Sequence, residues 1–140
     1  MASTQLSSGV VWDIIRRESS LLRKTKNIEL SSEKLNVRNV NSFKYSGLAQ
    51  PSIGVFVASG RSRPQLVRTN KNATTPKSAV TSVGLAGGVK RSAKAIHKAT
   101  KATYYRPDLK RDACAKYAAL CRAVAKKSVE LPVKRRTNKN

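Results

Sequence analysis

The feature that most constrains this chain is a long stretch without negative charge. From Lys34 to Pro107 the sequence runs for 74 residues without an aspartate or a glutamate. The whole chain of 140 residues carries a formal net charge of +22. Self-repulsion on this scale opposes compaction, so a polyanion is the natural partner, with nucleic acid ahead of an anionic membrane. No apolar run approaches the roughly 18 residues that a membrane-spanning helix needs.

The apolar residues suffice for one small core. Val, Ile, Leu and Phe make up 31 residues, or 22 % of the chain. This share lies just above the roughly 20 % below which highly charged chains stay disordered. We therefore expect one small domain over residues 1–133 with extended basic segments, and a basic tail at 134–140. We also expect only partial folding in the absence of a polyanion.

The first third of the sequence predicts one helix that packs into the core. Ser8 is placed to cap this helix, and Trp12 is its expected anchor in the core. The apolar face of the helix consists of Val10, Val11, Ile14 and Ile15. Residues 27–41 are polar and show no clear alternation.

Three short strands are predicted in the middle of the chain. Alternating side chains in SFKYSGL at 42–48 predict a half-buried strand, and IGVFVAS at 53–59 predicts a second. The sequence GRSRP at 60–64 predicts a basic hairpin loop, followed by a returning strand at 65–70. Residues 71–88 carry loop-forming residues and predict no regular element.

The last third predicts two basic helices. The first covers residues 89–103, and the second has Pro107 in its first turn, where the missing N–H costs nothing. Asp108 and Asp112 favour the start of this second helix because its dipole attracts negative charge. Its apolar stripe consists of Leu109, Ala113, Tyr117, Leu120 and Val124. The predicted fold class is α+β, with a small antiparallel sheet, an N-terminal helix, two C-terminal basic helices and a basic tail.

The helix at 89–103 carries its charges as a ridge of one sign. Lys90, Lys94, Lys98 and Lys101 follow helical spacing, with Arg91 beside them. Like charges at this spacing destabilise an isolated helix by about 0.2–0.5 kcal/mol per pair. A row of phosphates would relieve the repulsion, since each neutralised phosphate releases counterions. The alternative is a lysine face that serves only solubility.

The stretch TKATYYRPDLKRDA at 100–113 joins the two helices. Tyr104 and Tyr105 are adjacent, so one ring can pack inward while the other meets a partner. Stacking on an unpaired base and simple coverage of the core are both consistent with this pair. Arg106 has the forked guanidinium that suits a phosphate.

Two further basic segments extend the predicted contact surface. Arg61 and Arg63 lie in the hairpin loop. Lys134, Arg135 and Arg136 form a cluster in the tail that resembles a short nuclear-import or RNA-binding signal.

The sequence offers little for catalysis or metal binding. Cys114, Cys121 and His97 lack the spacing of a zinc site, and the two cysteines are expected to be small residues on the apolar side of the last helix. GLAGGVKRS at 84–92 lacks the lysine and hydroxyl positions of a phosphate loop. We therefore predict no enzyme, no cofactor, no metal and no small-molecule substrate.

Three segments together resemble a known family. NSFKYSGL at 41–48, IGV at 53–55 and YRPDLKRDACAKYAAL at 105–120 are similar to the eukaryotic large-subunit ribosomal protein family numbered twenty-eight. The resemblance extends from about Trp12 to Arg136. It implies a mixed α/β structural protein of the cytosolic large ribosomal subunit, bound to ribosomal RNA and neighbouring ribosomal proteins. It also implies residence in cytoplasmic ribosomes after a transient nuclear or nucleolar passage, and no membrane association.

On this interpretation the domain at 1–133 binds folded RNA by charge and shape. A chromatin or other nucleic-acid architectural protein is the alternative, and a reactive Cys114 or His97 in an enzyme is a more distant one. The predicted RNA contacts are Lys44, Arg61, Arg63, Lys90, Arg91, Lys94, Lys98, Lys101, Tyr105, Arg106, Lys110, Arg111, Lys134, Arg135 and Arg136.

Overall fold

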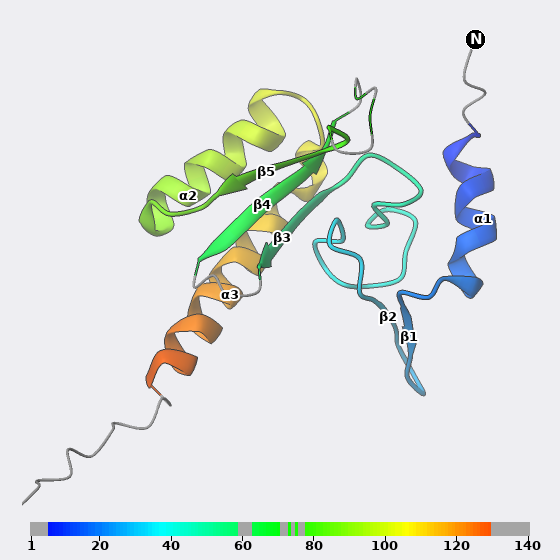
Figure 1. Ribbon diagram of the computed structural model, residues 1–140, viewed down its shortest axis with the longest axis horizontal. Coiled ribbons are helices and arrows are strands. Elements are labelled where there is room, and N and C mark those ends of the chain that lie inside the picture. The colour runs from blue at the N-terminus through cyan, green and yellow to red at the C-terminus, as the bar shows by residue number, and fades with distance from the viewer. Residues whose placement is uncertain (1–5, 59–62, 71–72, 74, 76–77, 130–140) are drawn as a thin grey trace, which may run out of the picture.

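The predicted α+β layout is confirmed by the computed structural model, which describes residues 6–58, 63–70, 73, 75 and 78–129. An N-terminal helix and a two-stranded hairpin precede a three-stranded sheet, and two further helices follow (Figure 1). In chain order the elements are α1 (Ser8–Glu18), β1 (Leu22–Lys24), β2 (Glu29–Ser31), β3 (Ile53–Val57), β4 (Pro64–Thr69), β5 (Val80–Gly84), α2 (Gly88–His97), the π-helical turn η1 (Lys98–Ala102), the 3₁₀ turn η2 (Pro107–Leu109) and α3 (Lys110–Val129).

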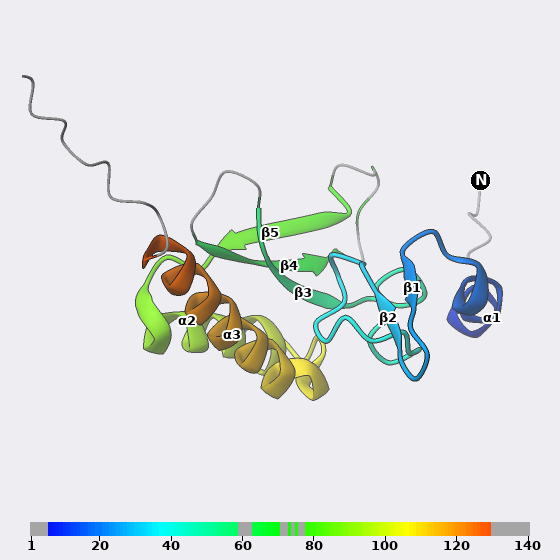
Figure 2. The same ribbon diagram turned by 90° about the horizontal axis from the view of Figure 1, so that it is seen from below.

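The main sheet and the last two helices form two layers. The strand order is β3-β4-β5, and both neighbouring pairs are antiparallel. In the register, Val55 lies opposite Leu66, and Leu66 lies opposite Val83. Helices α2 and α3 lie together against one face of this sheet (Figures 1 and 2). The predicted strands near 53–59 and 65–70 and the two predicted helices are therefore confirmed.

The hydrophobic core lies between these two layers. Ile53 and Val55 of β3 are fully buried and meet Ile96 of α2 and the stripe of α3. The stripe itself is confirmed, because its first three residues are buried and Leu120 packs against them. Both cysteines are free and pack against the same core, as expected from their positions.

Gly54 lets an irregular segment cross the sheet. Side chains alternate along a strand, so a side chain at 54 would point away from the face on which Ile53 and Val55 pack. A Cβ there would lie 1.8 Å from the backbone oxygen of Lys34. Any residue other than glycine would force the backbone of residues 34 and 35 to move.

The irregular segment at 32–50 is organised around a buried carboxylate. Glu33 accepts a hydrogen bond from the Gly47 backbone N–H at 2.7 Å and one from the Ser31 hydroxyl at 3.0 Å. The Ser46 hydroxyl lies 3.3 Å from both of its carboxylate oxygens. Hydrogen bonds to a charged group contribute about 1.5–3 kcal/mol each, so these bonds add to the burial of Val37 and Ala49 in holding the segment.

The strand predicted at 42–48 is wrong. The backbone N–H groups of Tyr45 and Ser46 both donate to the carbonyl oxygen of Ser42, so the chain turns. The alternation of aromatic and polar residues has another origin. The ring of Phe43 lies 6.0 Å from that of Trp12, while the Tyr45 hydroxyl donates to Asp112 on α3 at 2.9 Å.

Three strands were not expected from the sequence. β1 and β2 pair as a short antiparallel hairpin, and no strand was predicted over the residues of either. β5 lies within the predicted loop at 71–88, and all of its residues are exposed. Such strands form by backbone pairing with a neighbour, so no alternation of apolar and polar residues reveals them.

The prediction that α1 is a core helix is also wrong. None of its residues is buried, and the side chains of Val10 and Ile14 are 49% and 61% exposed. Its N-cap is Ser7 rather than Ser8, because the Ser7 hydroxyl accepts from the Val10 N–H at 3.4 Å. Trp12 contacts Phe43 of the irregular segment instead of the main core.

Candidate nucleic-acid interface

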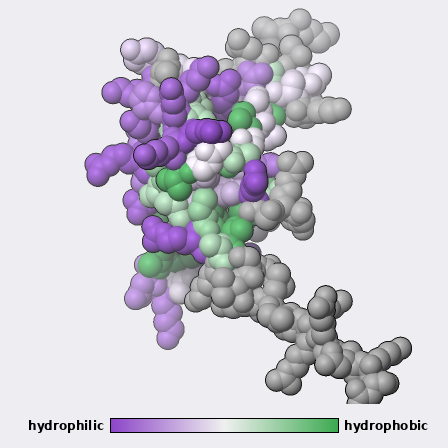
Figure 3. Space-filling model, turned by 90° about the vertical axis from the view of Figure 1, so that its left-hand side faces the viewer, coloured by the Kyte–Doolittle hydropathy of each residue, from purple (hydrophilic) through white to green (hydrophobic). Residues whose placement is uncertain are grey.

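The five cations predicted on the first basic helix form one exposed surface, which we call the lysine ridge. It consists of Lys90, Arg91, Lys94, Lys98 and Lys101, and all five are exposed. The opposite side of the same helix is anchored by Ser92, Ile96 and Thr100, which are buried. Figure 3 looks at the side of the molecule on which α2 lies in Figure 1 and shows hydrophilic side chains over much of this face.

No other described residue forms an ion pair or a side-chain hydrogen bond with the lysine ridge. The acidic residues nearest the core are used elsewhere: Asp108 pairs with Arg106 at 3.0 Å, and Asp112 lies 3.6 Å from Arg38. Glu33 holds the irregular segment. Because these carboxylates stabilise the fold, the charges of the ridge remain uncompensated.

The ridge ends in a turn with unusual backbone geometry. Thr100 donates its hydroxyl to the Ile96 carbonyl oxygen at 2.8 Å, within the wider π-helical turn η1. Tyr104 then adopts a left-handed conformation with φ of 49°. The N–H groups of Tyr104 and Tyr105 donate to the oxygens of Lys101 and Thr100, which is the pair of bonds in a Schellman motif. This conformation favours glycine, and for another residue it costs roughly 1–2 kcal/mol of conformational free energy.

The two adjacent tyrosines face opposite ways. The Tyr105 hydroxyl donates to the Thr69 carbonyl oxygen at 2.7 Å, and the ring packs against the core. Burial raises the pKa of this hydroxyl above its usual value, and the Thr69 side chain and the nearby Arg68 counteract the rise in part. Tyr104 is 85% exposed. The aromatic face open to a partner therefore belongs to Tyr104 and not to Tyr105, the residue predicted as a contact.

Arg106 is engaged within the fold. Its guanidinium forms a two-pronged pair with Asp108, with both bonds at 3.0 Å. It also donates to the carbonyl oxygens of Pro51 and Lys44, each at 2.8 Å. The hydrogen bond from Arg106 lowers the pKa of the Asp108 carboxyl. The side chain predicted to bind a phosphate thus ties three separate segments of the chain together.

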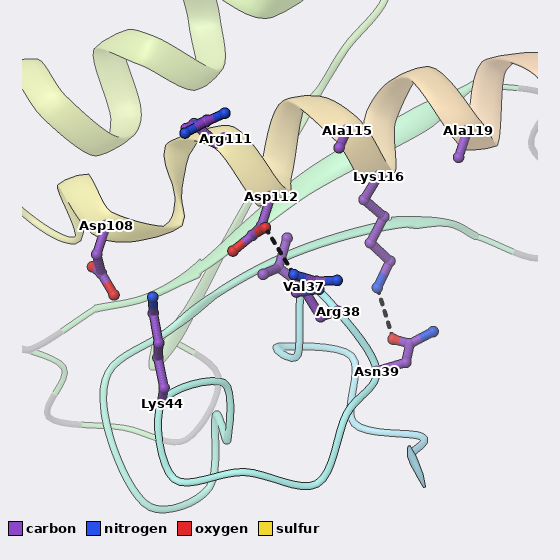
Figure 4. Close-up of a pocket in the computed structure, with 10 residues that line it drawn as sticks. All are labelled: Val37, Arg38, Asn39, Lys44, Asp108, Arg111, Asp112, Ala115, Lys116 and Ala119. Atoms are coloured by element: carbon purple, nitrogen blue, oxygen red, sulfur yellow. Dashed lines mark hydrogen bonds and ion pairs between the residues drawn. The ribbon is translucent and has the colours of Figure 1, made fainter. Parts of the chain in front are cut away.

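A second basic surface is a cavity of about 870 Å³ between the irregular segment and α3 (Figure 4). We call it the basic cleft, after four cations in its lining: Arg38, Lys44, Arg111 and Lys116. Lys44 extends from the irregular segment toward Asp108 in η2, just before α3, as Figure 4 shows. The two aspartates of the lining, at 108 and 112, already interact with Arg106 and Arg38.

Lys116 is the most perturbed cation of the cleft. Its ammonium donates to the Asn36 carbonyl oxygen and to Oδ1 of Asn39, both at 2.8 Å. Burial lowers its pKa from 10.5 to about 8. An anion in the cleft would favour the charged form and raise this pKa again.

The remaining predicted contacts lie at different places. Arg111 is exposed, and Lys110 is half-buried at the start of α3. Arg63 is exposed and donates to the Ala86 carbonyl oxygen at 3.4 Å. The predicted contacts at Arg61, Lys134, Arg135 and Arg136 lie outside the described residues.

Three residues of these surfaces were missed from the sequence. Arg38 and Lys116 stand in segments predicted to be irregular and helical, and only the folded chain brings them to one cleft. Tyr104 was recognised as one of a pair, but its outward direction depends on the left-handed turn. The lysine ridge was found because its helical spacing is visible in the sequence.

The described residues show no arrangement for metal chemistry or membrane insertion. Among them, no three His, Cys, Asp or Glu side chains gather as a metal site would require. None of the helices in this part of the chain has the length and apolar character needed to cross a membrane.

Comparison with known proteins gives a consistent result. The model of the Ribosomal L28e protein family matches residues 10–123. The large ribosomal subunit protein eL28 of Dictyostelium discoideum is 32% identical over 106 residues, which cover 75% of this chain and 79% of that protein. The protein of the same name from Caenorhabditis elegans is 37% identical over 78 residues, covering 54% of this chain and 60% of its own length.

Proposed function

Since the chain belongs to the Ribosomal L28e protein family, we propose that it is a structural component of the large ribosomal subunit in the cytoplasm. In this role it binds folded ribosomal RNA and adjoins other ribosomal proteins. The role requires no reaction and no cofactor. Transient passage through the nucleus or nucleolus during assembly belongs to the same proposal, supported by the basic cluster at Lys134, Arg135 and Arg136.

The lysine ridge is the observation that carries the RNA-binding proposal. Its five cations are exposed and uncompensated among the described residues, while the buried side of the same helix fixes their direction. Like charges held this close destabilise the free protein, and neutralisation by a row of phosphates reverses that effect. A surface needed only for solubility would carry charges of both signs.

The basic cleft supplies a second point of contact. It is large enough to receive a segment of RNA backbone, and Arg111 and Lys44 in its lining are exposed. Folded RNA is recognised mainly through phosphates and 2′-hydroxyls, so separate basic surfaces suit its shape better than a sequence-reading site does.

The other predicted contacts have unequal support. Arg63 is exposed and belongs to the hairpin loop predicted at 60–64. Arg61 and the tail cluster at 134–136 stay predictions from sequence. Tyr105 and Arg106 stay predictions as well, and both would have to release hydrogen bonds within the fold to bind RNA through their polar groups.

Sedimentation through a sucrose gradient tests the assignment. The tagged full chain should sediment with large subunits and leave that fraction after nuclease treatment. A ridge variant with Lys90, Lys94, Lys98 and Lys101 changed to Gln should be depleted from subunits. The matched control changes Arg17, Arg23, Lys24 and Lys26 to Gln, which removes the same charge from exposed positions of α1 and the first hairpin. Equal depletion of both variants would contradict a specific role of the lysine ridge in binding to the subunit.

Salt dependence gives a quantitative measure. If about ten phosphates are neutralised, the logarithm of affinity for structured RNA falls with log salt at a slope of roughly −7 to −9. The ridge variant should reduce the slope by about 3. A wild-type slope near −2 contradicts the proposal, and equally effective competition by duplex DNA would favour a general architectural protein.

A further inference from the structure

We propose that Tyr104 is a stacking platform for one unpaired RNA base at the end of the lysine ridge. This inference rests on the proposed function and makes it more specific: it names the kind of nucleotide that the ridge positions. The ligand is an unpaired nucleotide in a loop or bulge, flanked by RNA whose phosphates follow the ridge.

The first support is the contrast between Tyr104 and the other tyrosines. The hydroxyls of Tyr45 and Tyr105 donate to Asp112 and to the Thr69 carbonyl oxygen, and Tyr117 is buried in the core. Tyr104 is 85% exposed, and its side chain forms no hydrogen bond or ring contact with other described residues. Its ring therefore contributes nothing visible to the fold.

The second support is the backbone. Tyr104 occupies a left-handed position that glycine would fill without strain. The turn itself requires a positive φ and the two backbone hydrogen bonds, and it requires no ring. A strained residue whose side chain does not stabilise the fold indicates a functional constraint.

The third support is what surrounds the ring. Lys101, three residues earlier, is the last cation of the ridge, and Thr103 is also exposed. An aromatic ring beside a line of cations is the combination that binds single-stranded nucleic acid, because bases stack on the ring while phosphates meet the charges. An anchor for a protein pocket would be set in an apolar patch, which these neighbours do not provide.

Duplex RNA does not offer its base faces, so the platform selects unpaired nucleotides. Two RNA hairpins of equal phosphate number test this selection. One contains a single unpaired 2-aminopurine in its stem, and the other is fully paired with 2-aminopurine in the stem. The wild-type chain should prefer the first by roughly 5- to 150-fold. Binding should also quench the fluorescence of the unpaired base through stacking on the ring.

Two substitutions separate the ring from the backbone. Tyr104→Phe should keep the preference and the quenching, because the ring remains. Tyr104→Gly should lose both and should raise the melting temperature, since the strained conformation suits glycine. A merely structural tyrosine would give the reverse result for Tyr104→Gly, with a lower melting temperature and unchanged preference.

The outcomes also distinguish the platform from the proposed function. If the ridge variant binds both hairpins as tightly as wild type, RNA binding by the ridge fails. If the ridge variant weakens both hairpins while Tyr104→Gly retains the preference, the platform alone is overturned. If Tyr104→Gly is depleted from large subunits yet retains the preference, the ring meets a protein and the platform is likewise overturned.

Discussion

Residues 53–125 and residues 6–31 differ in how many apolar side chains they bury. Nine buried hydrophobic residues form the core of the described chain, and eight of them come from Ile53 to Tyr117. Residues 53–125 use a sheet and two helices to bury them. Residues 6–31 form a helix with a clear apolar face and a hairpin, yet α1 buries none of its residues.

The difference shows that an apolar pattern alone does not place an element in a core. α1 is held through the contact of Trp12 with Phe43 and a hydrogen bond from the Asn41 side chain to the Arg16 carbonyl oxygen at 2.9 Å. Such individual contacts contribute about 1 kcal/mol each. We infer that residues 6–31 open at low free energy in the isolated chain and become fixed when a partner covers them.

The largest expected effect compares two isoleucines. Ile96→Ala in α2 should destabilise the protein by about 2–5 kcal/mol, because Ile96 is fully buried and its truncation leaves a cavity. Ile14→Ala in α1 should change the free energy of unfolding by less than about 0.5 kcal/mol, since its side chain is 61% exposed. Urea unfolding followed by circular dichroism measures both.

Equal losses for the two variants would mean that α1 belongs to the same cooperative unit as the sheet. Hydrogen exchange provides an independent check: amides of β4 and α3 should exchange near the rate of global unfolding, and those of α1 much faster.

The next effect concerns Arg106, which connects the irregular segment to the start of α3. Arg106→Lys should destabilise by about 1.5–3 kcal/mol, because lysine cannot reproduce the fork onto Asp108 together with bonds to two carbonyl oxygens. Arg111→Lys is the matched control, since Arg111 is exposed and should change stability by less than about 0.5 kcal/mol.

Acid titration extends this comparison. Arg106 lowers the pKa of Asp108, so the carboxylate stabilises the fold above its ordinary pKa of 3.8, and this stabilisation is lost as pH falls through the lower, folded value. In Arg106→Lys the folded pKa should return toward its ordinary value, and acid unfolding should begin at a higher pH. An unchanged acid midpoint would contradict the role given to Arg106.

The two-layer region could be predicted because its periodicities are regular. Leu109, Ala113 and Tyr117 repeat at helical spacing on a buried face, and the lysines of the ridge repeat at helical spacing on an exposed face of the preceding helix. The two strands around the hairpin loop are short and rich in apolar residues, and each is buried over part of its length. In these elements local pattern and tertiary burial agree.

The irregular segment at 32–50 could not be predicted because its bonds join residues far apart in sequence. The carboxylate of Glu33 fixes Gly47, and Tyr45 reaches Asp112. Arg106, predicted as an RNA contact from its charge, is satisfied by Asp108 and two distant carbonyl oxygens. The sequence shows which residues are basic, but only the fold separates cations that are engaged internally from those left for a partner.

The smallest expected effect tests where the irregular segment at 32–50 meets α3, at Lys116. Its ammonium donates to Asn36 and Asn39 of the irregular segment, and burial lowers its pKa to about 8. Between pH 8 and 10.5 the unfolded chain holds a proton that the folded chain has released, so stability should rise as pH increases through this window. Solvent screening at this half-buried site should keep the gain below about 1 kcal/mol.

Melting temperatures of the wild type and Lys116→Met, recorded from pH 7 to 9.5, isolate this contribution, because the two proteins differ only at this side chain. The melting temperature of the wild type should rise relative to that of the variant as the pH increases. If the wild type instead loses stability, the two hydrogen bonds of the charged ammonium outweigh the cost of its burial. Lys116 would then bind the irregular segment to α3 mainly in its charged form. Structured RNA should abolish the gain, since phosphate near the basic cleft keeps Lys116 protonated.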